Sequence, residues 1–266
     1  MARFIEILRR AIDVIAAICG LLALTIPLWF VVAAFGTKWE FWDWHTGLET
    51  MTYAWGFALL LAGLVSGVLA ASFILIHLAF AKRSHGNWTS AIAILLIAST
   101  GMGWMIHINR LQQAQPALLD ITTDFSDPPG FSTAFLERRL TSDSDLAYAG
   151  KTAADGQDLP VLQAQYYPEI ASLQLAEPAD SVFGRALDLA RDRGWRVGTA
   201  SRQAGMFEAG AEGFWFGFRD DMAVRIRSDE AGGSIVDMRS LARQPVHDLG
   251  RNAGRVKTFL EALAAG

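Results

Sequence analysis

Residues 11–35 read AIDVIAAICGLLALTIPLWFVVAAF, and Asp13 is the one charged side chain in this run. A helix rises about 1.5 Å per residue, so roughly 20 apolar residues cross a hydrocarbon layer about 30 Å thick. Two more long apolar runs follow at residues 55–81 and 88–108. The sequence therefore predicts a three-helix transmembrane anchor over residues 1–108.

A cleaved signal peptide is the alternative for the first run, because Arg3, Arg9 and Arg10 precede it. A signal peptide has an apolar region of about 7 to 15 residues and ends at a small-residue cleavage site. The run at 11–35 is much longer, and no convincing cleavage site appears before Lys38. The sequence favours a retained first span.

Basic side chains gather on one side of the predicted spans. Three arginines precede the first span and the second connection contains Lys82 and Arg83, whereas acidic residues dominate the first connection. The positive-inside rule then makes the N-terminus and the second connection cytoplasmic. We expect a multi-pass protein of the inner (plasma) membrane, whose chain after Arg110 is periplasmic if the host is a Gram-negative bacterium.

Charge is distributed unevenly along the 266 residues. Residues 1–118 contain seven Lys and Arg against five Asp and Glu, whereas residues 119–266 contain 16 against 22. The net charge of −4 gives no sign of nucleic-acid binding. Cys19 is the single cysteine, which excludes an intramolecular disulfide framework and a cysteine-based zinc cluster.

Two histidines in the predicted spans raise the alternatives of haem ligation and proton relay. His77 lies near the end of the second span and His107 near the end of the third. The predicted topology puts them on opposite sides of the bilayer, where they cannot share one iron. We therefore interpret both as interfacial side chains and expect no cofactor and no metal.

Two further patterns concern contacts of the anchor. The segment KWEFWDW at residues 38–44 is typical of an aromatic belt at the lipid interface, with a ligand or quinone platform as the alternative. Gly63 and Gly67 form a small-xxx-small pair, which favours packing within the bundle over homodimerisation.

The pattern changes after the third apolar run. LQQAQPALLDITTDFSDPPGFS at residues 111–132 has three prolines and no periodicity, and we predict an extended linker over 109–133. Residues 161–167 predict a strand, and Asp180 or Ser181 is the expected cap of a helix ending at Gly194.

Extended segments are expected next, at residues 195–200, 206–212 and 214–218. Residues 221–227 and 234–241 then alternate apolar and charged side chains around a DEAGG turn, which predicts a hairpin with one buried and one charged face.

A last amphipathic helix is expected after Asp248, a suitable N-cap. The order of elements predicts an exported α+β domain with a mainly antiparallel sheet over residues 134–266.

Five segments of this half resemble one bacterial family, called domain of unknown function 1499. They are DITTDFSDPPGF (120–131), YYPEI (166–170), GW (194–195), FGFRDDMAVRI (216–226) and VDMRSLARQPVHDLGRNAGRVKTFLEAL (236–263). The chain departs from the family's RSxSRxG segment at Ala242 and Pro245. The resemblance implies an envelope protein of uncharacterised activity, in some members with a similar three-helix anchor.

Catalytic motifs are absent from the sequence: it has no nucleophile elbow, Walker loop, dinucleotide-binding glycine pattern or HExxH. His247 is the one histidine after residue 110, and its neighbour Asp248 is needed as a helix cap. Asp220 and Asp221 are interpreted as a solvated turn rather than a general-acid dyad. We therefore predict no catalytic residue.

The charged face of the hairpin and the start of the last helix contain the remaining candidates. Guanidinium groups and a helix N-terminus suit recognition of carboxylate or phosphate, but the interleaved acids suit a self-contained lattice of ion pairs better. The candidate ligand or partner residues are Arg225, Arg227, Asp237, Arg239, Arg243, Asp248, Asn252 and Arg255.

Two functions remain open on these grounds. The first is a non-catalytic membrane protein whose periplasmic domain binds another envelope protein or an anionic lipid-like ligand. The second is an envelope hydrolase or lipid-modifying enzyme that uses the charged hairpin and the helix N-terminus.

Overall fold

The computed structural model describes the chain except for residues 84, 87, 138–147, 149 and 154–155. Two compact units make up the fold. One contains residues 1–110 together with Trp215–Gly217, and the other contains residues 111–214 and 218–266.

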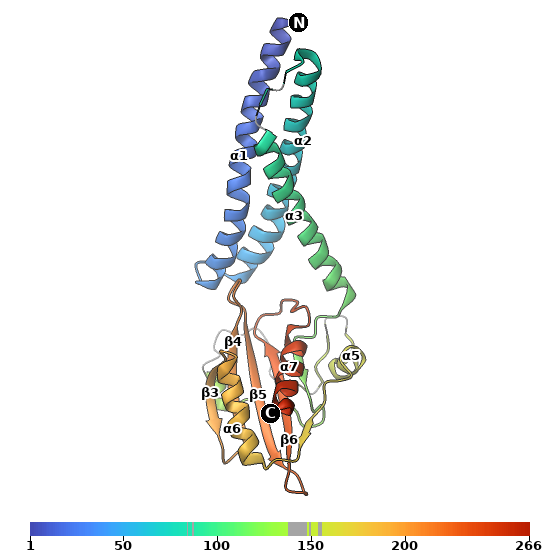
Figure 1. Cartoon of the computed structure of the whole chain (residues 1–266). Helices are drawn as coiled ribbons and strands as arrows, with labels where there is room; N and C mark the ends of the chain where they lie inside the picture. The colour runs from blue at the N-terminus through green and yellow to red at the C-terminus, as the bar shows by residue number, and fades with distance from the viewer. Residues whose placement is uncertain (84, 87, 138–147, 149, 154–155) are drawn as a thin grey trace. The chain divides into compact units, whose positions relative to one another are not determined.

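Three long apolar helices form the first unit, as the sequence predicts (Figure 1). They are α1 (Ala2–Lys38), α2 (Gly56–Ala81), which a π-helical segment η1 (His45–Trp55) precedes without a break, and α3 (Trp88–Ala114). Each is long and apolar enough to cross a membrane. The helices extend beyond the apolar runs because the flanking polar residues continue the helical conformation.

Two glycines of α2 leave room for side chains of α3. A Cβ added to Gly67 would lie 2.7 Å from Leu95, and one added to Gly63 would lie 3.1 Å from Ala98. Side-chain atoms of α3 fill these spaces, so a larger residue at either position would displace them. The packing within the bundle that the sequence favours is therefore confirmed.

His77 has a structural role in this unit. It is fully buried, its Nε2 accepts a hydrogen bond of 3.2 Å from Arg9, and its Nδ1 lies 3.0 Å from the Arg83 carbonyl oxygen. Both ring nitrogens are thus occupied by groups of the protein itself.

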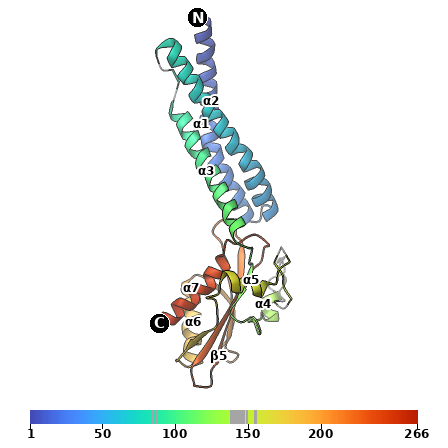
Figure 2. The ribbon, with the colours of Figure 1, turned by 90° about the vertical axis from the view of Figure 1, so that its right-hand side faces the viewer.

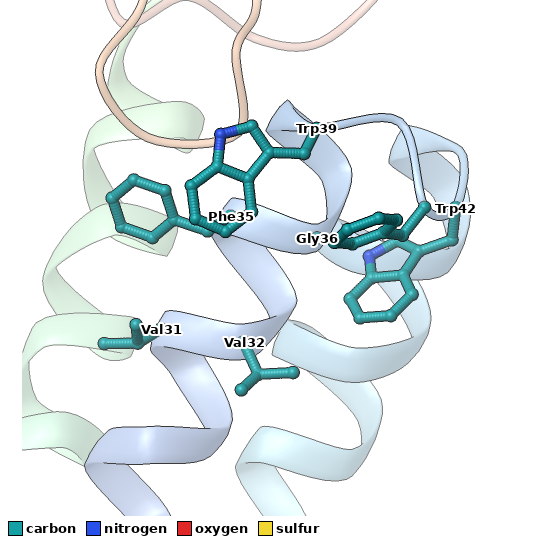
Figure 3. A pocket seen from close by; sticks show the side chains of 7 residues that line it. Val31, Val32, Phe35, Gly36, Trp39 and Trp42 are labelled. Atoms are coloured by element: carbon teal, nitrogen blue, oxygen red, sulfur yellow. The ribbon is translucent and has the colours of Figure 1, made fainter.

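The aromatic segment after α1 folds back onto that helix. Figure 3 shows the Trp42 ring against α1 at Gly36, where an added Cβ would lie 2.0 Å from the ring. The indole Nε1 donates to Thr37 Oγ1 at 3.1 Å. Next to this contact lies an apolar hollow of about 350 Å³, lined by Val31, Val32, Phe35, Gly36, Trp39, Phe41 and Trp42.

The second unit is an α+β domain around an antiparallel sheet, which confirms the predicted fold class. The strand order is β1-β6-β5-β4-β3, and β2 also pairs with β6. The strands are β1 (Asp120–Thr122), β2 (Leu173–Leu175), β3 (Arg196–Ser201), β4 (Met206–Glu212), β5 (Arg219–Ser228) and β6 (Ser234–Ala242). The helices are α4 (Thr133–Glu137), α5 (Leu159–Tyr166), α6 (Ala179–Asp192) and α7 (Arg251–Ala265).

The core lies between the sheet and helices α6 and α7, which Figure 2 shows on the same side of β5. The predicted hairpin is confirmed, with Val224 of β5 opposite Met238 of β6. Both side chains are fully buried, as are Val256 and Phe259 of α7. Period-two alternation sends every second side chain of the hairpin to the other face of the sheet.

The predicted linker over 109–133 is wrong in two places. The helix α3 continues to Ala114, and Asp120–Thr122 form the strand β1 with residues 239–241 as partners. A strand of three residues leaves no periodic pattern, and its partner lies more than a hundred residues away in the sequence. Local composition therefore gave no signal for it.

Three local predictions in this unit also need correction. The strand expected at 161–167 is the helix α5, with a proline in its first turn, where the fixed φ of proline suits a helix. The helix α6 has Pro178 at its N-cap, and neither Asp180 nor Ser181 is the cap residue. Residues 214–218 form a turn rather than a strand, because Phe216 and Gly217 have φ values of 59° and 66°.

Candidate functional site

The candidate residues of the hairpin lie on the sheet face opposite α6 and α7. Alternation along β5 places Arg225 and Arg227 there, and the register sets Arg225 opposite Asp237 of β6. Arg239 follows two residues later on the same face. We call this group, with the acids that it binds, the charged face.

Asp237 is the centre of the charged face. Its side chain is fully buried and accepts hydrogen bonds from Arg225 Nη2 at 3.0 Å and Arg227 Nη2 at 2.7 Å. The hydroxyl groups of Thr123 and Ser172 donate to its other oxygen at 3.3 and 2.5 Å. Four donors around one carboxylate satisfy its acceptor capacity and fix both arginines.

A second layer of acids holds the outer side of Arg225. Its Nη1 lies 2.8 Å from Asp127 Oδ2, and its Nη2 lies 3.4 Å from Asp124 Oδ2. Burial acts to raise the pKa of Asp124, but hydrogen bonds from Ser126 and the Asp127 amide, with the Arg225 charge, outweigh burial and lower it. Asp124 therefore stays ionised and keeps its pairing.

Arg239 forms the most buried ion pair of the charged face. Its Nε and Nη2 donate to the two oxygens of Asp120 at 2.9 and 2.7 Å, and Lys151 Nζ lies 2.7 Å from the same carboxylate. The guanidinium carbon lies 5.6 Å from the centre of the Phe131 ring and 5.4 Å from that of Tyr148. Burial, followed by the Asp120 charge, raises the pKa of Tyr148 above its ordinary value.

Arg243 is paired in the same manner. It donates to Asp221 through Nε at 3.0 Å and through Nη2 at 2.7 Å, and Asp221 is fully buried. Each of these four candidate arginines thus binds a carboxylate from the same domain. They are Arg225, Arg227, Arg239 and Arg243.

The other candidates form a separate cluster on the helix side of the sheet. Asp220 binds Arg251 at 2.9 Å and Arg255 at 2.8 Å. Buried Asn252 accepts from Ser240 Oγ at 2.6 Å. Asp220 and Asp221 are buried residues of β5, so their interpretation as a solvated turn is wrong. As consecutive strand residues they point to opposite faces, so they separate the predicted set into two groups and do not form a dyad.

Asp248 stabilises the start of α7 from outside the helix. Gly250 occupies the N-cap position with φ of 77°, so Asp248 is not the N-cap residue that the sequence predicts. Its carboxylate nevertheless accepts hydrogen bonds from the Asn252 amide at 2.8 Å and the Gly250 amide at 3.1 Å. Asp248 therefore accepts hydrogen bonds at the start of α7, as expected of a cap, but it lies two residues before the N-cap position.

His247 is held by backbone groups. The Leu249 amide donates to Nδ1 at 3.0 Å, so Nε2 carries the proton and donates to the Gln115 carbonyl oxygen at 3.0 Å. The Asp248 carboxylate is used at the start of α7, not at the imidazole. In the described part of the chain, no group of three or more His, Cys, Asp or Glu is placed to hold a metal ion.

Glu208 is a buried acid that sequence analysis missed. It is 3% exposed, its carboxylate accepts from Ser132 Oγ at 2.6 Å, and the Ser132 amide and Thr199 Oγ1 also donate to it. It adjoins a hollow of about 530 Å³, lined by Gly130, Phe131, Ser132, Thr199, Ala200, Ser201, Ala204, Met206 and Glu208. Alternation in β4 places Glu208 on the same face of the sheet as Arg225. The contact with Ser132 is not predictable from local sequence, because the two residues are 76 positions apart.

The C-terminal half of the chain matches a family model. The model of a family described as "Protein of unknown function (DUF1499)" matches residues 120–263, from the first residue of β1 into the last turns of α7. No curated protein matches the chain. The matched residues include every strand of the sheet.

Proposed function

Because the chain belongs to the DUF1499 family, a family of unknown function that it matches over more than half its length, we propose a function from its geometry. The protein is a multi-pass membrane protein of the cell envelope whose C-terminal domain binds a protein partner and catalyses no reaction. The observation that carries the proposal is the mutual pairing of charges on the charged face.

A face whose cations are already paired recruits a free anion poorly. Arg239 and Asp237 are buried. Arg239 donates to Asp120 through Nε and Nη2, and Asp237 accepts four hydrogen bonds from the same domain. An anionic headgroup would have to displace a carboxylate that is better placed. This favours the protein partner over the anionic lipid-like ligand.

The outer members of the charged face remain accessible to a partner. The Arg227 side chain is 44% exposed and the Asp127 side chain is 69% exposed. Rim charges of both signs steer association and exclude wrong partners more than they add affinity. A surface that carries charges of both signs suits a specific protein contact.

The enzyme alternative has less support from the same residues. Both nitrogens of His247 are engaged by backbone groups, and Asp220 and Asp221 are each bound to arginine. A general base or acid would first have to leave these partners.

Charge reversal tests the proposed contact. We expect Arg227→Glu to abolish recovery of a stoichiometric protein partner on gentle detergent purification from the native membrane, analysed by mass spectrometry of bound proteins and lipids. Arg191→Glu is the matched control, because Arg191 lies on α6 and its side chain is 58% exposed. Recovery of the unsubstituted chain without a protein partner would contradict the proposal, and so would its recovery with an anionic lipid that Arg227→Glu releases.

The proposed topology places the N-terminus in the cytoplasm and the C-terminal domain in the periplasm. The basic residues before α1 and between α2 and α3 support this orientation. Cys19 is the single cysteine of the chain, so Cys19→Ser gives a cysteine-free background into which single cysteines can be introduced.

Cysteine labelling in intact cells checks the topology. We expect Glu230→Cys, in the exposed turn between β5 and β6, to react with a membrane-impermeant maleimide once the outer membrane is permeabilised. Ala2→Cys should react only after the inner membrane is also opened. The reverse order of reactivity would overturn the orientation.

A further inference from the structure

The turn between β4 and β5 contains large exposed aromatic side chains. Its sequence is GFWFGF at residues 213–218, and Phe214 and Trp215 are 66% and 54% exposed. The turn at the other end of β5 reads DEAGG at residues 229–233 and has no aromatic residue. The two ends of the hairpin strands therefore differ sharply in polarity.

The backbone fixes the shape of the aromatic turn. The Gly213 amide donates to the Phe218 carbonyl oxygen at 2.7 Å, and the Gly217 amide donates to that of Trp215 at 2.7 Å. Phe216 adopts a left-handed conformation, with φ of 59°. An aromatic residue with positive φ is uncommon, so this turn is specified by local hydrogen bonds rather than by propensity.

Sheet register places the aromatic turn at the end where the chain enters the domain. Asp120, the first residue of β1, pairs with Leu241, and Leu241 pairs with Asp221 near the start of β5. The aromatic turn leads directly into that start, at Arg219. The polar turn at residues 229–233 lies at the opposite end of β5 and β6.

The connection from the third apolar helix to this end is short. The helix α3 ends at Ala114 and β1 begins at Asp120, so residues 115–119 span at most about 20 Å when extended. Gln115 is also bound to the domain, through its carbonyl oxygen to His247 at 3.0 Å and through Oε1 to the Tyr167 hydroxyl at 3.3 Å. The apolar run of α3 ends at residue 108, so residues 109–114 add about 9 Å of helix to this connection. The chain therefore holds the domain within about 30 Å of the end of that run.

We propose that the aromatic turn of residues 213–218 inserts into the headgroup layer of the membrane in which the helices lie. Indole and phenyl rings favour this layer, because it accepts an apolar ring while leaving the indole N–H and the backbone near water. The turn thereby adds a lipid contact at the end of the sheet where the chain enters, and the polar turn stays in the aqueous phase.

Site-directed fluorescence in vesicles tests the insertion. The full chain with Cys19→Ser and Phe214→Cys is labelled with an environment-sensitive fluorophore and reconstituted into phosphatidylcholine vesicles. Spin-labelled phosphatidylcholine, with the nitroxide near the headgroup end of the acyl chain, is the lipid quencher, and iodide is the aqueous quencher. We expect lipid quenching several-fold stronger than for the matched Glu230→Cys label, and iodide quenching several-fold weaker.

Two results would overturn the proposal. A label at position 214 that iodide reaches as readily as at position 230 places the turn in water. A label shielded from both quenchers places it against protein instead of lipid. Retention of the strand signal in circular dichroism by both labelled chains ensures that the comparison is made on folded domains.

Discussion

Replacing Asp120 by alanine is expected to lower the free energy of unfolding of the C-terminal domain by about 3–5 kcal/mol, the usual cost of breaking a buried ion pair from one side. The change leaves Arg239, whose side chain is 4% exposed, and Lys151, at 17%, without their shared carboxylate. For a domain of this size the loss corresponds to a fall of about 10 °C in Tm. Thermal unfolding of the full chain in detergent, followed by the strand signal in circular dichroism, measures it.

Two further variants separate charge burial from simple loss of a side chain. The double variant Asp120→Ala with Arg239→Met should recover much of the loss, because the buried cation is then removed as well. Asp188→Ala removes an ion pair whose carboxylate is 72% exposed, and Tm should move by less than about 2 °C. Equal shifts for Asp120→Ala and Asp188→Ala would show that burial of the pair has no energetic role.

Gly205→Ala is expected to destabilise the same domain by about 2–4 kcal/mol, which combines a left-handed backbone penalty with a steric clash. Gly205 has φ of 61°, and an added Cβ would lie 2.2 Å from the carbonyl oxygen of Ile226. That oxygen is part of the backbone of β5, so no flexible side chain can move aside. The substitution must push β4 away from β5 and break the hydrogen bond of 2.7 Å from the Ile226 amide to the Gly205 carbonyl oxygen.

Gly232→Ala is the matched control for this clash. Gly232 also has positive φ, at 87°, but an added Cβ meets nothing within 4 Å. The control should show the backbone penalty alone, about 1–2 kcal/mol. The same unfolding experiment compares the two, and a loss for Gly205→Ala no larger than for Gly232→Ala would contradict the steric argument.

Elements whose pattern is local were predictable from the sequence. The three apolar helices needed only length and hydropathy, and the β5–β6 hairpin needed only alternation around a glycine-containing turn. Errors arose where distant residues decide the outcome. Residues 120–122 form a strand because the edge of β6 is available. Residues 159–166 form a helix although Val161 and Tyr166 are residue types that favour strands.

The candidate site was predictable in composition but not in pairing. Alternation put Arg225, Arg227, Asp237 and Arg239 on one face, and the structure agrees. Besides Asp237, the acids that bind these arginines are Asp120, Asp124 and Asp127, which come from the segment predicted to be a linker. The sequence groups the start of α7 with that face because guanidinium groups and a helix N-terminus both suit anion recognition. The two are on opposite sides of β5, since Asp220 binds Arg255 of α7 and Asp221 binds Arg243.

The pairing of β1 with β6 sets the order in which the domain is completed. Asp120 and Arg239 are 119 residues apart, and β6 contributes the partners of β1, β2 and β5. During synthesis the first strand to emerge therefore has no partner until nearly the whole chain has been made. Long-range strand pairing of this kind is slow and leaves unpaired edges exposed meanwhile. If the domain crosses the membrane, its amino-terminal part must do so before it can fold, and closure of the sheet is a late, post-translocational event.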